Sequence, residues 1–302
     1  MTPGLDARGL WIAVASFVLW GVMPLYWHAL RVVPSLQIVL HRIVWGALLV
    51  GAWLLFKHGR HWLRDTLRTP RAAWLLALSG VLISINWGLY IWAVNAGHIV
   101  ESSLGYYINP LLSVALGVVV LKERMTRLQW ASVSLAAIGV GWLTLRFGQV
   151  PWIALTLACS FAIYGLIRKV VAVDAVRGLG VENAYLLLPA LALIGWSEAT
   201  GRGGFVSTWG PGIDAMLVFG GALTALPLIG FAYAVRRVPL SVVGLLQYIA
   251  PTLQFLIGVL VFREPFGADR AIGFACIWIA LAIFAVDSVM RSRRQSQLVA
   301  AV

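Results

Sequence analysis

Residues 98–124 read HIVESSLGYYINPLLSVALGVVVLKER. Apolar side chains dominate this stretch over about 20 residues, the length at which an α-helix crosses the hydrocarbon core of a bilayer. The stretch nevertheless contains a glutamate, an Asn-Pro pair and a charged ending, LKER. A carboxylate and a proline inside an apolar span need a structural or functional reason. The stretch therefore predicts a membrane helix with a task beyond anchoring the chain.

The whole chain has the composition of a membrane protein. Of its 302 residues, 61% are hydrophobic and 11% are charged, and the mean hydropathy is +0.90. Soluble domains are only about 45–50% apolar and about 25% charged. The predicted fold class is all-α, a polytopic membrane protein with ten transmembrane helices. We expect these helices at 9–29, 36–56, 72–95, 98–121, 128–146, 150–168, 181–199, 213–235, 239–262 and 270–290.

The net charge of +12 is distributed as a topology signal. If the N-terminus lies inside, 17 lysines and arginines fall in inner segments and 5 in outer segments. By the positive-inside rule, we expect both termini in the cytoplasm. Since the basic residues lie in short loops without a soluble domain to present them, membrane lipid is an expected partner and nucleic acid is not.

The chain repeats itself at a constant shift of 141 residues. The pattern YIxP occurs at 107–110 and again at 248–251, and the pair KE at 122–123 aligns with RE at 263–264. The alignment needs no gaps, which favours a true repeat over shared membrane-helix composition. We therefore expect two five-helix repeats, residues 1–146 and 147–302, the second ending in a short basic tail.

An odd number of spans in each half turns the second half upside down. The charges of equivalent loops agree, because AVNAGH at 93–98 has no lysine or arginine whereas AVRRVP at 234–239 has two. Inverted repeats of this kind bind substrate near the bilayer midplane and exchange conformations to give alternating access. Channels also contain such repeats, so the repeat indicates a permeation pathway more strongly than it indicates a carrier.

Polar and aromatic side chains share helix faces near the depth of the two prolines. We expect Pro110 and Pro251 to break their helices and to free the backbone carbonyls four residues earlier. The expected cavity is aromatic and mostly uncharged, which suits a small amphipathic solute better than a phosphate or bare ion. For the small hydroxylated residues nearby, helix packing is the alternative. The expected substrate-cavity residues are Trp20, Asn86, Tyr90, Tyr106, Asn109, Tyr164, Gln247 and Tyr248.

Four ionisable residues inside the spans are candidates for coupling or gating: Glu101, His41, Arg42 and Glu182. An unpaired arginine at a span centre costs about 2.5–3.5 kcal/mol, so Arg42 needs a partner or a water path. Glu101 is the candidate partner at similar depth, and snorkelling of both to the headgroups is the alternative. Because Glu101, His41 and Glu182 can take up a proton, protons are the candidate coupling ion.

The sequence resembles a known family. SLGYYINPLLSVALGVVVLKER at 103–124 and QYIAPTLQFLIGVLVFREP at 247–265 resemble the EamA transporters of the drug/metabolite transporter superfamily. LHRIVW at 40–45, NWGLYIWAVN at 86–95 and FACIWIALAIF at 274–284 resemble its RarD branch. The resemblance implies a permease of the bacterial inner membrane, often labelled a chloramphenicol-sensitive or chloramphenicol-resistance permease, whose relatives export amino acids and other metabolites. It also implies a basket of ten helices, with spans 1, 3, 4, 6, 8 and 9 around the central cavity.

We therefore expect a secondary transporter that moves small organic metabolites or drug-like solutes by alternating access, with proton coupling left open. A passive facilitator of the same fold is the first alternative. An intramembrane enzyme that uses His41, Arg42 and Glu101 is the second, although no phosphate loop, HExxH pair or GxSxG elbow is present. We expect no enzymatic activity, no cofactor and no metal site, and the cysteines, Cys159 and Cys276, lie inside predicted spans.

Overall fold

The computed structural model describes residues 6–95, 99–147 and 150–261, and, from the last predicted span, 271–273, 275–284, 286–287 and 290. All regular structure in these residues is helical, so the all-α prediction is confirmed. The helices are α1 (Ala7–Ala29), α2 (Ser35–His58), α3 (Trp62–Leu67), α4 (Pro70–Asn95), α5 (Ile99–Val119), α6 (Arg127–Phe147), α7 (Trp152–Val170), α8 (Ala175–Ala199), α9 (Pro211–Val235), α10 (Leu240–Leu246) and α11 (Ile249–Leu260).

Eight helical segments are long and apolar enough to cross a membrane, with α10 and most of α11 forming one of them, Leu240–Ile257. Two shorter apolar helices, Leu104–Val119 and Ala271–Phe284, coincide with the fourth and tenth predicted spans. Large apolar side chains such as Phe56, Leu145 and Leu188 face outward with exposures of 94%, 80% and 75%. An apolar outer surface of this kind is what lipid contact requires.

Local sequence signals explain where the helices begin. Asp6 caps α1 by accepting hydrogen bonds from the amides of Arg8 and Gly9, at 3.0 and 3.1 Å. Asp174 caps α8 in the same way. An aspartate at this position satisfies amides that have no partner within the helix. Because of this cap, α8 begins at Ala175, well before the predicted start at residue 181.

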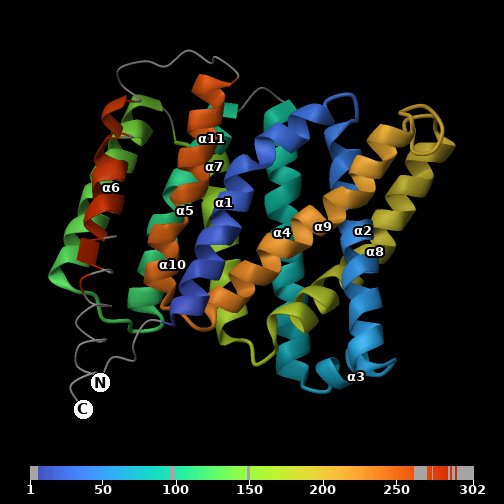
Figure 1. The fold of residues 1–302 in the computed structure, drawn as a ribbon, viewed down its shortest axis with the longest axis horizontal. Helices are drawn as coiled ribbons and strands as arrows, with labels where there is room; N and C mark the ends of the chain where they lie inside the picture. Colours follow the sequence, from blue (N-terminus) through green and yellow to red (C-terminus); the bar gives the residue numbers. More distant parts are fainter. Residues whose placement is uncertain are drawn as a thin grey trace.

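Figure 1 shows the helices side by side along the long axis of the molecule, from α6 through α5 and α11 to α2 and α8. Helix α1 packs against α9 and α11, whereas α7 packs against α4 and α5. Helix α2 lies against α8 and α9, and α10 lies against α5. Helices α1, α4, α5, α7, α9, α10 and α11 therefore surround the middle of the bundle.

Aromatic rings fill part of this middle. The ring of Tyr164 stacks on Phe231 with centroids 6.1 Å apart, and Phe17 meets the same Phe231 edge-on at 6.2 Å. Close helix contact depends on small residues, because a Cβ added to Gly105 would lie 2.9 Å from the carbonyl oxygen of Ala154. Glycine at 105 thus lets α5 approach the backbone of α7.

The helices around Pro110 and Pro251 differ in continuity. Helix α5 continues through Pro110 without interruption, so the break predicted there is wrong. A proline removes a single helical hydrogen bond, and packing of the surrounding helices can maintain the helix around it. The interruption in the second half lies at Gln247 and Tyr248, just before Pro251. There the carbonyl of Gln247 accepts from the amide of Ala250, at 3.2 Å, since Pro251 has no amide hydrogen to offer.

Candidate functional site

A cavity of about 640 Å³ lies within the bundle. Its wall is formed by residues of α1, α4, α5, α7, α9 and the α10–α11 segment, together with Arg42 of α2. The aromatic part of the lining consists of Phe17, Trp20, Trp27, Trp87, Tyr90, Tyr106 and Phe161. The polar part consists of His28, Arg42, Asn86, Asn109, Thr224, Gln247 and Gln254.

Most of the predicted cavity residues are brought together here. Trp20, Asn86, Tyr90, Tyr106, Asn109 and Gln247 all line the cavity, as does Pro251. Tyr164 and Tyr248 do not belong to the lining, and their side chains are 1% and 0% exposed. Tyr248 directly follows Gln247, and a step of one residue turns a helical side chain by about 100°. It therefore points into the α5 contact, where its ring stacks on Tyr107.

The amides in the wall are anchored by neighbouring helices. Asn86 donates from Nδ2 to the carbonyl oxygen of Leu157, at 2.8 Å, and to Oγ of Ser160, at 3.0 Å. Gln247 donates from Nε2 to Oγ of Ser113, at 3.1 Å. Each amide is thus held in one orientation by a helix other than its own.

Arg42 makes the cavity more cationic than the sequence suggested. Its Nε donates to Oγ1 of Thr224 at 2.8 Å, and its guanidinium carbon lies 4.7 Å from the ring centroid of Trp27 and 5.0 Å from that of Trp87. The partner predicted for Arg42 was Glu101, whose side chain lies outside the described residues. The rest of the described lining has no lysine, arginine, aspartate or glutamate, so the lining is mostly uncharged, as expected, with Arg42 as the exception.

The side chain of His41 points away from the cavity, toward Phe205. Its ring is 3% exposed, accepts at Nδ1 from Nε1 of Trp45 at 3.2 Å, and lies 4.6 Å from the ring of Phe205. It does not belong to the cavity lining. One residue of helical rotation separates it from Arg42, so the two neighbours face different surroundings.

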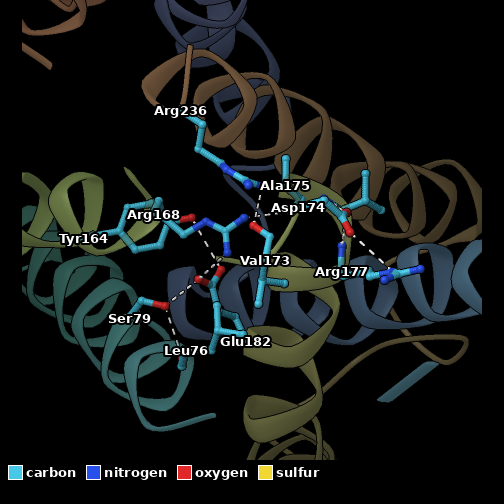
Figure 2. A network of polar contacts seen from close by, with 11 residues as sticks. Leu76, Ser79, Tyr164, Arg168, Val173, Asp174, Ala175, Arg177, Glu182 and Arg236 are labelled. Carbon is cyan, nitrogen blue, oxygen red and sulfur yellow. Dashed lines mark hydrogen bonds and ion pairs between the residues drawn. The ribbon is translucent and has the colours of Figure 1, made fainter. Parts of the chain in front are cut away.

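A buried charged network lies at the end of α7 and the beginning of α8. Figure 2 shows Arg168 and Glu182 pointing toward each other, with Ser79 and Tyr164 beside the carboxylate. Arg168 Nη1 lies 3.4 Å from Glu182 Oε1, and the two side chains are 0% and 1% exposed. Ser79 donates to the same carboxylate oxygen, and Tyr164 donates to Oε2 at 3.4 Å. The network therefore joins α4, α7 and α8.

The role of Arg168 was not predicted from the sequence, where this arginine counted among the basic residues of the inner segments. In the structure, helix α8 begins at Ala175 and covers it. Nη2 of Arg168 donates to the carbonyl oxygen of Ala175 at 2.8 Å. A Cβ added to Gly178 would lie 1.8 Å from Nη1 of Arg168, so only glycine leaves space for the guanidinium. The glycines of GLGVE at 178–182, next to an acidic residue, were the available signal.

A second polar cluster lies at the beginning of α10. Glu123 accepts from the backbone amides of Leu240 and Ser241, at 2.7 and 2.9 Å. Nζ of Lys169 lies 3.5 Å from Oε1 of Glu123 and donates to the carbonyl oxygens of Val235 and Val238. Glu123, within the LKER stretch at 121–124, thus caps a helix.

The two ends of the bundle differ in access. The lining of the cavity extends to exposed His28, next to the end of α1. The Arg168–Glu182 network and the Glu123–Lys169 cluster lie between the helices at the opposite end, and none of these four residues belongs to the lining. The arrangement is a pocket in the middle of a helical bundle that opens toward one side.

Comparisons with known proteins agree with this architecture. Residues 7–145 match the EamA-like transporter family. Protein RarD of Streptomyces exfoliatus is 45% identical over 95% of this chain and 90% of its own length. A protein of Vibrio cholerae described as an uncharacterized transporter is 44% identical over 96% of each chain. One solved crystal structure shares the fold with a TM-score of 0.69 at 20% identity, over 93% of this chain and 98% of that chain.

A multi-pass bundle of apolar helices around a central cavity is typical of membrane permeases. The chain belongs to the EamA-like transporter family, and its close relatives place it among the RarD-like members. It is therefore a bacterial-type multi-pass membrane protein of a transporter family.

Proposed function

We propose that the protein is a secondary transporter that carries small organic solutes across the bacterial plasma membrane by alternating access. The observation that carries this proposal is the central cavity, which extends to one end of the bundle while polar clusters fill the other. A pocket accessible from one side at a time is the requirement of a carrier, whereas a channel needs a continuous path.

The finer architecture in this proposal is ten membrane spans in two inverted halves, 1–146 and 147–302. The positions of the helices support it. Shifted by 141 residues, the starts of α2, α4 and α5 fall at 176, 211 and 240, and α8, α9 and α10 start at 175, 211 and 240. The family match, which ends at residue 145, covers the first of these halves.

The helix contacts also support a pseudo-two-fold relation. Under the shift, α1 corresponds to α7, α4 to α9, and α5 to the α10–α11 segment. Packing of α1 on α11 and α9 then has its counterpart in packing of α7 on α5 and α4. The helices α5 and α10, which also pack on each other, are each other's counterparts. Two halves with equivalent contacts can exchange conformations at little cost.

The proposed orientation has both termini in the cytoplasm, as the distribution of basic residues indicates. The cavity then opens to the outside, and the Arg168–Glu182 network closes the cytoplasmic side. Opening toward the cytoplasm requires Ser79 of the first half to separate from Glu182 of the second. Among the gating candidates, Glu182 is therefore the one with the clearest structural task, and protonation of its carboxylate is the proposed route for proton coupling.

Transport in liposomes tests the function. Comparison of the metabolites inside and outside cells with and without this protein supplies the solute, and purified protein in liposomes is then loaded with it. Uphill movement driven by a pH gradient supports the proton-coupled carrier. Strictly downhill flux supports the passive facilitator, and consumption of the solute without its movement supports an enzyme and overturns the proposal.

A further inference from the structure

Arg42 is a cation in the cavity wall to which the transport mechanism alone gives no task. Among the described lining residues, it is the one with a permanent charge. Within the described part of the chain, no carboxylate lies within 4.0 Å of its guanidinium. A positive charge in a membrane-spanning helix is costly, and functional sites are where such charges persist.

The guanidinium is held in a fixed orientation. Thr224 accepts the hydrogen of Nε, and the rings of Trp27 and Trp87 lie within 5.0 Å of the guanidinium carbon. Because Nε is engaged, the edge that carries the two Nη groups remains for another partner. This edge presents two parallel N–H donors, the geometry that matches the two oxygens of a carboxylate.

Two other lining residues, Asn109 and Gln247, have hydrogen-bond acceptors, whereas Arg42 has only donors. Oδ1 of Asn109 and Oε1 of Gln247 have no hydrogen-bond partner among the described residues, although these side chains are 8% and 4% exposed. Buried acceptors without a donor are unfavourable and point to a missing partner. As far as the described residues go, the cavity wall thus has a guanidinium with no carboxylate within 4.0 Å and two amide oxygens with no donor.

We propose that the cavity selects amphipathic organic monocarboxylates that also carry a hydrogen-bond donor. This inference rests on the proposed transport function and names its substrate class. Arg42 binds the carboxylate, and the aromatic wall contacts the apolar body. The amides of Asn109 and Gln247, whose oxygens are buried, turn toward the solute on binding and accept from its donor. A single arginine suits a monoanion better than a phosphate dianion, and the positive charge of Arg42 disfavours a cationic solute.

Binding of three small probes to the purified protein in detergent tests the proposal at pH 7. The probes are 3-phenylpropanoate, its neutral analogue 3-phenylpropanamide, and 3-phenyllactate, which adds a hydroxyl donor. Quenching of tryptophan fluorescence is a suitable readout because Trp27 and Trp87 flank Arg42. We expect the propanoate to bind about ten-fold more tightly than the amide, and the lactate about three-fold more tightly than the propanoate. Equal affinity for all three probes would overturn the proposal.

Variants assign the two preferences to their residues. Arg42→Gln is expected to abolish the preference for carboxylate over amide, and Thr224→Val, which keeps the charge but frees Nε, is expected to reduce it. Asn109→Leu is expected to remove the advantage of the hydroxyl while the carboxylate preference stays. If Arg42→Gln does not fold, Thr224→Val still decides, since an unchanged carboxylate preference in that variant contradicts the role of a fixed guanidinium.

Arg202→Gln is the matched control. Arg202 also lies over a tryptophan, 5.2 Å from the ring centroid of Trp196, but does not belong to the cavity lining. The same loss of charge at this position is expected to leave all three affinities unchanged. Because these measurements concern binding, a failed carboxylate preference in a protein that still transports its solute refutes this inference and leaves the proposed function intact.

Discussion

Arg168 and Glu182 form an ion pair at 3.4 Å in which both side chains are buried. Removing one member of a fully buried ion pair leaves an uncompensated charge, which costs about 3–5 kcal/mol, whereas replacing both members by apolar residues costs much less. We expect Arg168→Met and Glu182→Leu each to lower the unfolding temperature of the purified protein strongly. The double variant is expected to recover most of the loss.

Thermal unfolding in detergent measures these three variants side by side. Exposed Arg68 and Asp65, which form an ion pair at 3.7 Å, provide the control pair, since surface ion pairs contribute little. Strictly additive losses for Arg168→Met and Glu182→Leu would show that the two residues do not stabilise each other.

Glu101, the carboxylate in residues 98–124, is a candidate for proton coupling whose side chain lies outside the described residues. Under the 141-residue shift its counterpart is Val242, so its carboxylate belongs to one half alone. If Glu101 couples transport to protons, Glu101→Gln removes the dependence of solute flux on the pH gradient in liposomes. Unchanged flux and unchanged pH dependence would exclude Glu101 as the coupling residue.

At the residue scale, the sequence predicted positions that share a helix face better than it predicted charges. Asn86, Tyr90, Tyr106 and Asn109 follow helical spacing, and all four line the cavity. Arg168 was misjudged because it is the last residue of the predicted span 150–168, where an arginine usually meets the inner membrane surface. Its partner, Glu182, comes from another helix, and a contact between helices leaves no trace in local spacing.

Helix α8 contains a glycine at 178, where a larger residue does not fit, and another at 195, where a larger residue does fit. Because Gly178 faces the Arg168 guanidinium at a distance that excludes a methyl group, Gly178→Ala forces the helix or the ion pair to move. Overpacking of this kind costs about 1–3 kcal/mol. We expect Gly178→Ala to lower the unfolding temperature, although alanine is the better helix former.

Gly195→Ala in the same helix is the control, since a Cβ there would meet nothing within 4 Å. Alanine is expected to stabilise the helix at that position by up to about 1 kcal/mol. Equal effects of the two substitutions on the unfolding temperature would contradict the close contact at Gly178.

At the scale of helices, the apolar segments of the sequence predicted where each membrane helix lies. They predicted the ends and interruptions of these helices less well. Helix α8 begins at Ala175 because Asp174 caps it, and charged residues in its first turns concealed that start. The 141-residue repeat indicates the correct start of α8. The second predicted span starts at residue 36, and its equivalent position in the second half is 177, close to Ala175. Proline marks a site where a helix can break, and surrounding packing decided that α5 continues through Pro110 while the second half is interrupted before Pro251.

The whole molecule combines a cavity that extends toward one end with packed polar clusters at the other, and thiol accessibility can establish which end faces the cytoplasm. Gln254 lines the cavity, whereas Ser79 is fully buried in the network of Arg168 and Glu182. Native Cys159 and Cys276 are free, so both are first replaced by alanine. In that background, a membrane-impermeant maleimide added outside intact spheroplasts is expected to label Gln254→Cys and to spare Ser79→Cys.

Opening of the cytoplasmic side should then expose position 79 to the other compartment. Adding Arg168→Ala to the Ser79→Cys variant removes the cation that holds Glu182, which is expected to increase labelling in inside-out vesicles and to decrease labelling of Gln254→Cys from outside. The two changes are coupled because a rigid exchange between halves opens one side as it closes the other. Labelling of Gln254→Cys from the cytoplasmic side alone would reverse the proposed orientation. Simultaneous labelling of both positions from both sides would replace the carrier with a continuous pore.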